Sequence, residues 1–218
     1  MLSFSFRTLV DSPPRILCLG AHCDDIEIGC GGTLLTLLER YPQAAVRWVV
    51  FSGTPERAEE SRRSAELFLT HSGEIRVDVF DYRDGFFPSL LEPIKERFEE
   101  LAAFRPDLIF THYRDDRQQD HRVVSDLTWN TFRRHCVLEY EIPKYDGDLG
   151  IPNFFVPLTD AICARKTQAL LDGFPSQRSK QWFDAETFRA ILRLRGMEAN
   201  SPTRYAEAFY ARKAVFSP

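Results

Sequence analysis

Hydrophobic and polar positions follow two alternating patterns along the first part of the chain. Short apolar runs rich in β-branched and aromatic residues predict strands at Ile16–Ala21, Val46–Ser52, Ile75–Tyr82 and Leu108–His112. Helical spacing of apolar residues predicts helices between them, at about Gly31–Arg40, Glu56–Leu69 and Leu90–Phe104. Parallel strands that alternate with helices are joined by right-handed crossovers. We therefore expect an α/β fold with a Rossmann-like, mostly parallel sheet and helices on both faces.

The pattern is looser after Val137. It predicts a strand near Val137–Ile142, a loop rich in Asp, Gly and Pro, helices near Thr159–Asp172 and Asp184–Arg195, and a last strand at Glu207–Val215. No linker-like composition separates this part from the rest, and 218 residues are enough for one large core. We expect a single domain over residues 1–218, with residues 137–218 as its C-terminal extension.

Charge and composition narrow the class of partner. The formal net charge is -4 and the pI is near 5.8, so the chain lacks the basic field that attracts nucleic acid or an anionic membrane. It contains no run of about 18 apolar residues of the kind that predicts a membrane span, and the N-terminal segment lacks the apolar core of a signal peptide. The five cysteines form no CxxC pair, which indicates reduced thiols. We expect a cytoplasmic protein that binds a small molecule.

Polar side chains follow two of the predicted strands. His22, Asp24 and Asp25 come directly after the first strand, and a segment that contains His121 follows the fourth. In doubly wound sheets the first and fourth strands flank the point where the winding reverses, and ligands bind at that edge. Two imidazoles and one carboxylate form a suitable set of divalent-metal ligands. The sequence therefore predicts that His22, Asp25 and His121 converge at a metal site.

Other interpretations of these residues fit the sequence less well. A His/Asp/His set also occurs in non-haem iron oxygenases, but those enzymes usually have jelly-roll sheets rather than alternating strands and helices. Gly29, Gly31 and Gly32 do not have the GxGxxG spacing of a dinucleotide site. Taken alone, Asp24 and Asp25 would be interpreted as a helix N-cap and a first-turn carboxylate.

Two motifs give the chain a family resemblance. The stretch AHCDD at residues 21–25 resembles the AHPDD motif of the PIG-L/LmbE family of zinc-dependent N-acetylglucosaminyl deacetylases, with Cys23 in place of the proline. The DxHxDH pattern of that family is matched by Asp116, Asp120 and His121. Weaker signatures of the family are matched by Arg57, Glu60, Asp84 and the stretch Tyr205–Phe209.

The resemblance implies a function and a role for each matched residue. The implied Zn²⁺ ligands are His22, Asp25 and His121, a set that also suits Fe²⁺. Asp24 would be the general base that takes a proton from the attacking water, and Arg57 and Asp84 would bind sugar hydroxyls. The implied reaction removes the N-acetyl group from an N-acetylglucosamine-type sugar in a glycoconjugate or its precursor. A homo-oligomer is compatible with this assignment.

The chain departs from the family pattern at Gln118, where the family has a histidine that is implicated in stabilising the oxyanion or assisting the leaving group. Gln118 is thus a candidate catalytic residue whose amide NH₂ can donate a hydrogen bond but cannot deliver a proton. Losing one such donor typically lowers the rate about 100- to 1000-fold. We therefore expect Gln118→His to raise turnover.

Two alternative functions stay open at this point. One is an amidase that acts on another amide, such as a thiol conjugate, and the other is a sugar-binding protein that retains the metal with weak or no catalysis. The group attached to the sugar would be selected by loops after the core strands and by the segment Tyr145–Phe155. Tyr145, Asn153 and Phe154 are the candidate pocket residues there.

Overall fold

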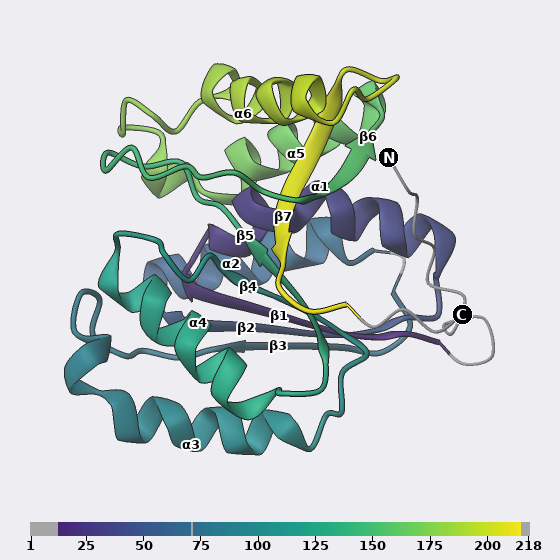
Figure 1. Ribbon diagram of the computed structural model, residues 1–218. Coiled ribbons are helices and arrows are strands. Elements are labelled where there is room, and N and C mark those ends of the chain that lie inside the picture. The colour runs from purple at the N-terminus through teal and green to yellow at the C-terminus, as the bar shows by residue number, and fades with distance from the viewer. Residues whose placement is uncertain (1–12, 71, 215–218) are drawn as a thin grey trace.

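A seven-stranded sheet forms the centre of the computed structural model, which describes residues 13–70 and 72–214 (Figure 1). The strand order is β3-β2-β1-β4-β5-β7-β6. The strands are β1 (Arg15–His22), β2 (Ala45–Ser52), β3 (Ile75–Val79), β4 (Leu108–His112), β5 (Cys136–Tyr140), β6 (Phe154–Leu158) and β7 (Tyr205–Ala211). Strands β1 to β5 are parallel, and β7 runs antiparallel to both β5 and β6. The predicted mostly parallel α/β sheet is confirmed.

Helices cover both faces of the sheet, as the sequence predicted (Figure 1). One face carries α1 (Asp25–Arg40), α2 (Pro55–Phe68), α5 (Asp160–Gly173) and α6 (Ala185–Glu198). The other face carries α3 (Leu91–Ala102) and α4 (Gln119–Thr131). Two short 3₁₀ turns, η2 (Phe87–Ser89) and η3 (Pro175–Gln177), complete the set of described elements. Each face has its own apolar core, one around Trp48 and Tyr140 and the other around the stacked rings of Phe51 and Phe98.

Helix α1 begins at Asp25, six residues before the predicted Gly31. Its glycines are part of the helix and allow it to pack closely against its neighbours. A Cβ atom on Gly29 would overlap the ring of Tyr140, and one on Gly32 would overlap Leu158. The helix therefore approaches the sheet more closely than any residue with a side chain allows. This early start places Asp25 in the first turn of α1.

Two elements were missed from the sequence. Helix α4 has the polar sequence QDHRVVSDLTWNT, and its burial rests on a few residues such as Val124 and Leu127. Strand β6 contains Pro157, which lowers its strand propensity, but β6 lies at the edge of the sheet, where a missing N–H is tolerated. Both elements are stabilised by tertiary packing that a local pattern does not report.

Three predicted strands differ at their ends. Strand β3 stops at Val79, three residues before the predicted end, and β5 stops at Tyr140, two residues before the predicted Ile142. Strand β7 occupies Tyr205–Ala211 instead of beginning at Glu207. The predicted end at Val215 lies outside the described residues, as does most of the N-terminal segment considered for a signal peptide. In the described part of the chain, no helix combines the length and the apolar character that crossing a membrane requires.

Candidate metal centre

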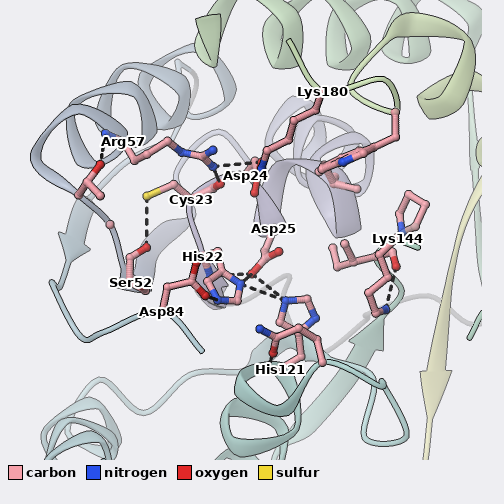
Figure 2. Close-up of a pocket in the computed structure, with 17 residues that line it drawn as sticks. His22, Cys23, Asp24, Asp25, Ser52, Arg57, Asp84, His121, Lys144 and Lys180 are labelled. Carbon is pink, nitrogen blue, oxygen red and sulfur yellow. Dashed lines mark hydrogen bonds and ion pairs between the residues drawn. The ribbon is translucent and has the colours of Figure 1, made fainter. Parts of the chain in front are cut away.

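Two neighbouring strands bring the predicted site residues to one edge of the sheet. Strands β1 and β4 are parallel neighbours, with Ile16 opposite Leu108, so their carboxyl ends point the same way. His22 is the last residue of β1, and the chain enters α1 directly after Asp24. The loop after β4 leads into α4, whose first turn carries His121. The neighbourhood expected from the strand order is therefore present (Figure 2).

The three predicted metal ligands face one another. His22 Nδ1 lies 3.2 Å from His121 Nε2, and Asp25 Oδ2 lies 3.6 Å from each of these two nitrogens. Zinc bonds of about 2.0–2.1 Å at tetrahedral angles separate ligand atoms by about 3.3 Å. The spacing and the donor types thus fit a zinc ion with three protein ligands. The other sets of His and Asp side chains that could hold a metal ion in the described part of the chain each share His22 or His121 with this set.

The far nitrogen of each histidine ring faces a carboxylate. His121 Nδ1 lies 3.0 Å from Asp116 Oδ2, and His22 Nε2 lies 3.0 Å from Asp84 Oδ1 and 3.3 Å from Asp120 Oδ2. Such carboxylates fix the tautomer and the orientation of metal-binding imidazoles. Burial alone would lower the pKa of His22, but its hydrogen bonds to Asp120 and Asp25 outweigh burial and raise it well above the usual value.

Asp120 and Asp116 are themselves held in place. Asp120 is fully buried and accepts hydrogen bonds from the backbone N–H groups of Gly85 and Phe87, at 2.6 and 3.1 Å, which ties the loop before η2 to α4. Burial alone would raise the pKa of Asp116, but hydrogen bonds from His121 and Lys144 lower it to about 2. Both carboxylates are therefore suited to orienting the histidines.

His112 lies behind Asp25, with its Nε2 3.2 Å from Asp25 Oδ2. Its side chain is fully buried, and its Nε2 accepts a hydrogen bond from the backbone N–H of Ala21 at 2.9 Å. Burial lowers the pKa of His112 to about 4, so the ring is neutral at physiological pH.

Burial would raise the pKa of Asp25, but the adjacent His121 and His112 rings hold it well below its usual value. Asp25 is therefore ionised and available as a ligand.

Asp24 sits at a strained point of the backbone. Its φ of 107° lies in the left-handed region that non-glycine residues rarely adopt. Arg57 holds this turn, because its guanidinium donates to the carbonyl oxygen of Cys23 and lies 3.1 Å from Asp24 Oδ2. The Cys23 side chain is directed toward β2, where its Sγ lies 3.5 Å from the carbonyl oxygen of Ser52. Burial raises the pKa of Asp24 to about 6, against the opposing charge of Arg57.

Gln118 has a structural role that the sequence did not reveal. It is the N-cap of α4, and its side-chain oxygen accepts hydrogen bonds from the backbone N–H groups of Asp120 and His121. This arrangement directs the amide oxygen toward the helix, so the NH₂ group is the end that is left for the cavity. Gln118 is also among the residues that line that cavity.

The candidate site opens into a cavity of about 310 Å³. Arg57 and Asp84, expected to bind sugar, both line it. Tyr145, Asn153 and Phe154 are not among the lining residues, and Tyr145 is 75% exposed, so that expectation was wrong. The cavity wall from the region after β5 consists instead of Ile142, Pro143 and Lys144, and the loop before α6 adds Lys180 and Trp182.

Sequence reasoning had assigned none of these five residues to the site. Lys144 follows β5, so the strand-end argument that led to His22 could have identified it. Lys180 and Trp182 lie between η3 and α6, far from any strand end. No local pattern indicated that this loop folds back over the site.

The C-terminal strand is tied to the helix that carries Asp25. Glu207 of β7 accepts hydrogen bonds from the backbone N–H groups of Gly32 and Thr33 in the middle of α1, at 2.7 and 2.6 Å. Lys166 of α5 donates to Glu207 and to the carbonyl oxygen of Ile28, both at 2.6 Å. All of these groups are buried, so the ion pair fixes α1 relative to β7 and α5.

Comparison with known proteins identifies a family and a fold. Residues 17–132 match the PIG-L family model, described as GlcNAc-PI de-N-acetylase. The chain is 32% identical over 141 residues to the uncharacterized deacetylase YaiS of Escherichia coli (strain K12). The aligned segment covers 59% of this chain and 74% of that protein. The family match covers β1 to α4, the part of the structure that carries the candidate metal ligands.

Solved structures with the same fold differ in activity. N,N'-diacetylchitobiose deacetylase from Pyrococcus horikoshii is 21% identical, with a TM-score of 0.72 over 94% of this chain and 86% of that one. GalB, a 4-carboxy-2-hydroxymuconate hydratase from Pseudomonas putida, is 16% identical, with a TM-score of 0.70 over 94% of this chain and 98% of that one. A deacetylase and a hydratase thus share this fold, and the reaction has to be argued from the site.

Proposed function

The chain belongs to the PIG-L family of deacetylases, and from this premise we propose that it is a zinc-dependent hydrolase that removes the N-acetyl group from an N-acetylglucosamine-type sugar in a glycoconjugate or its precursor. The observation that carries the proposal is the spacing of the three donor atoms of His22, Asp25 and His121, beside the carboxylate of Asp24. When bound there, zinc would polarise a carbonyl oxygen and lower the pKa of a water ligand to about 7.

Asp24 is suited to move the proton in this reaction. A pKa of about 6 leaves its carboxylate mostly ionised at neutral pH while keeping it basic enough to accept a proton. Asp24 would take a proton from the attacking water and return it to the departing amine nitrogen. The balanced outcome is cleavage of the amide C–N bond by one water, which gives acetate and the free amino sugar. Arg57 would hold Asp24 in place through both steps.

Gln118, Arg57 and Asp84 would bind the rest of the reacting group. The Gln118 NH₂ is proposed to donate a hydrogen bond to the oxygen that becomes negatively charged when water adds to the amide carbon. Asp84 contacts His22 through Oδ1, which leaves its other oxygen to accept a hydrogen bond from a sugar hydroxyl. Arg57 lines the same cavity and would donate to a second hydroxyl.

The proposal is tested by free-amine release from a panel of N-acetylglucosamine compounds with different groups at the anomeric carbon. Zinc-loaded protein is compared with Asp24→Asn, which keeps the shape of the side chain but removes the base. Release that depends on zinc and falls by at least about 100-fold in Asp24→Asn supports the deacetylase function. Metal content is measured in both proteins, so that a loss of zinc is not taken for a loss of the base.

Two outcomes would contradict this function. Release of a larger acid from another amide, such as a thiol conjugate, with no acetate from any N-acetyl sugar, would show an amidase of different specificity. Saturable sugar binding without release of any acid would show a metal-retaining binding protein in which Gln118 does not support catalysis.

A further inference from the structure

The carboxylate that orients His121 is shared with a lysine of the C-terminal region. Asp116 Oδ2 lies 3.0 Å from His121 Nδ1, and the same oxygen accepts a hydrogen bond from Lys144 Nζ at 2.9 Å. The other oxygen of Asp116 accepts a hydrogen bond from the backbone N–H of Gln118 at 2.8 Å. A single carboxylate oxygen therefore lies between a candidate metal ligand and an ammonium group.

All three N–H donors of the Lys144 ammonium have an acceptor. Besides Asp116, the ammonium lies 2.8 Å from Asp148 Oδ2 and donates to the carbonyl oxygen of Ile142 at 3.1 Å. Asp148 also accepts a hydrogen bond from the backbone N–H of Arg117 at 2.7 Å. Figure 2 shows the ammonium nitrogen of Lys144 on the His121 side of the cavity, away from Arg57. Lys144 therefore acts on Asp116 and has no donor left for a ligand in the cavity.

The loop that carries Lys144 is closed at its base by a buried ion pair. Glu141, the residue after β5, accepts a hydrogen bond from the backbone N–H of Gly150 at 2.9 Å and lies 2.7 Å from the guanidinium of Arg195 in α6. Glu141 and Arg195 are both buried. The position of Lys144 relative to Asp116 is therefore set by the fold and not by a free surface loop.

The effect of Lys144 on a metal follows from its bond to Asp116. A carboxylate on the far nitrogen of a metal-binding imidazole makes the ring a stronger electron donor to the metal. A cationic donor on the same carboxylate oxygen withdraws part of that negative charge, and a positive charge also repels a divalent cation. Both effects lower the affinity of the site for zinc. A lysine that only supported its loop would have the opposite effect, because it would hold His121 in place and raise the affinity.

We propose that Lys144 is a positioning residue that lowers the affinity of the candidate site for zinc by acting through Asp116 on His121. Weaker electron donation by the ligands leaves a bound zinc ion a stronger Lewis acid. The proposal rests on the zinc site of the proposed function. Lys144 lies beyond residues 17–132, the segment that matches the family model, so the C-terminal region would adjust a metal site that the family segment builds.

Zinc affinity tests the proposal without any turnover. Zinc-loaded protein is titrated with a chromophoric zinc chelator, and the zinc Kd is obtained for the wild type, Lys144→Met and Lys144→Arg. Lys144→Met keeps the length of the side chain but removes the charge, and it is expected to lower the Kd about tenfold, as for other partners of metal-binding histidines. Lys144→Arg is expected to keep the Kd within about threefold of the wild type, because the charge and a donor to Asp116 remain.

A double-mutant cycle shows whether Lys144 acts through Asp116. Asp116→Asn removes the carboxylate charge and is expected to raise the Kd at least tenfold. Adding Lys144→Met to this variant should change the Kd by less than about threefold, because the shared oxygen no longer carries the charge. Lys95→Met is the matched control, since it removes the same charge from an ion pair with Glu99 outside the cavity, and it should leave the Kd unchanged.

The outcomes separate this proposal from the proposed function. An unchanged or higher Kd in Lys144→Met would overturn the proposal, and a higher Kd would show that the lysine only supports its loop. Urea denaturation checks that each variant folds; if Lys144→Met does not, Lys144→Gln keeps a neutral donor and should lower the Kd about threefold. Zinc binding that tightens in these variants, with no amine released from any sugar, would support the role of Lys144 and contradict the deacetylase function. A wild type that binds no zinc would overturn both.

Discussion

The two regions of the sheet contribute differently to the site. The N-terminal region, residues 15–131, carries the candidate metal ligands and Asp24 at the ends of parallel strands. The C-terminal region, residues 136–211, supplies no member of the His22–Asp25–His121 cluster, but it provides the cavity rim with Lys180 and the buried pair of Lys166 and Glu207. The difference indicates that the candidate metal ligands are held by the first region, while part of the cavity rim and the support of α1 come from the second.

The largest effect is expected from removing a candidate metal ligand of the N-terminal region. His121→Ala should lose tightly bound zinc and lower amine release by more than about 1000-fold, because metal activation of water and carbonyl is lost. Metal analysis and amine release measure the two effects. His135→Ala, which removes a histidine outside the cavity, is the control and should retain both. Full zinc binding by His121→Ala would contradict the ligand assignment.

The next largest effect tests the support that the C-terminal region gives to α1. Glu207→Gln leaves the buried ammonium of Lys166 without its partner, which should lower the free energy of unfolding by about 3–5 kcal/mol in urea denaturation. Adding Lys166→Met should recover part of this loss, because the uncompensated charge is then removed. Glu99→Gln, which breaks an exposed ion pair with Lys95, should change stability by less than about 1 kcal/mol. A similar small change in Glu207→Gln would show that the buried pair is not needed.

A smaller effect concerns Glu27, a carboxylic acid that is fully buried in α1. Burial raises its pKa to about 8 from 4.5, so the native protein binds this proton more tightly than the unfolded chain does. Its contribution to stability is fully present below pH 4.5 and is lost as the pH rises through 8. In chelator-treated protein, Glu27→Gln should gain about 2 kcal/mol relative to the wild type between pH 6 and pH 8.

The Glu27 prediction is measured by urea denaturation at each pH. Glu59→Gln, exposed on α2, is the control and should follow the wild type at every pH. Parallel pH profiles for Glu27→Gln and the wild type would show that Glu27 is not protonated in the native state.

The smallest expected effect is at Gln118. Gln118→His should raise turnover of the preferred N-acetyl sugar on the order of tenfold, because an imidazolium can carry charge and deliver a proton. The same change should lower stability by about 1 kcal/mol, since Gln118 caps α4. Gln119→His is the matched control, because the Gln119 amide donates to the carbonyl oxygen of Gly85 and does not line the cavity. A turnover that is unchanged or lower would show that the glutamine has another role here.

Much of the parallel sheet could be predicted from the sequence. Strands β1, β2 and β4 bury nearly every residue, so their apolar runs stand out, and they lie within a residue or so of the predicted bounds. The apolar spacing predicted the start of α1 at about Gly31, six residues late, whereas the interpretation of Asp24 and Asp25 as an N-cap and a first-turn carboxylate gives the start that the structure shows. The spacing failed because Gly29 and Gly32 contribute no apolar side chain, and only their contact with Tyr140 and Leu158 shows that they pack inside the helix. Strand β6 was missed because Pro157 is unfavourable inside most strands. It is tolerated at the edge of the sheet, a position that the local sequence does not reveal.

The sequence alone was enough to group His22, Asp25 and His121, because the order of strands in a doubly wound sheet places the ends of β1 and β4 side by side. It also singled out Asp24 and Gln118 through their motifs. Only the tertiary structure placed Lys180 and Trp182 in the cavity and Glu207 against α1. These contacts join residues far apart in sequence, such as Gly32 and Glu207, and they depend on how the antiparallel strands and the last helices fold back over the sheet, which no local spacing encodes.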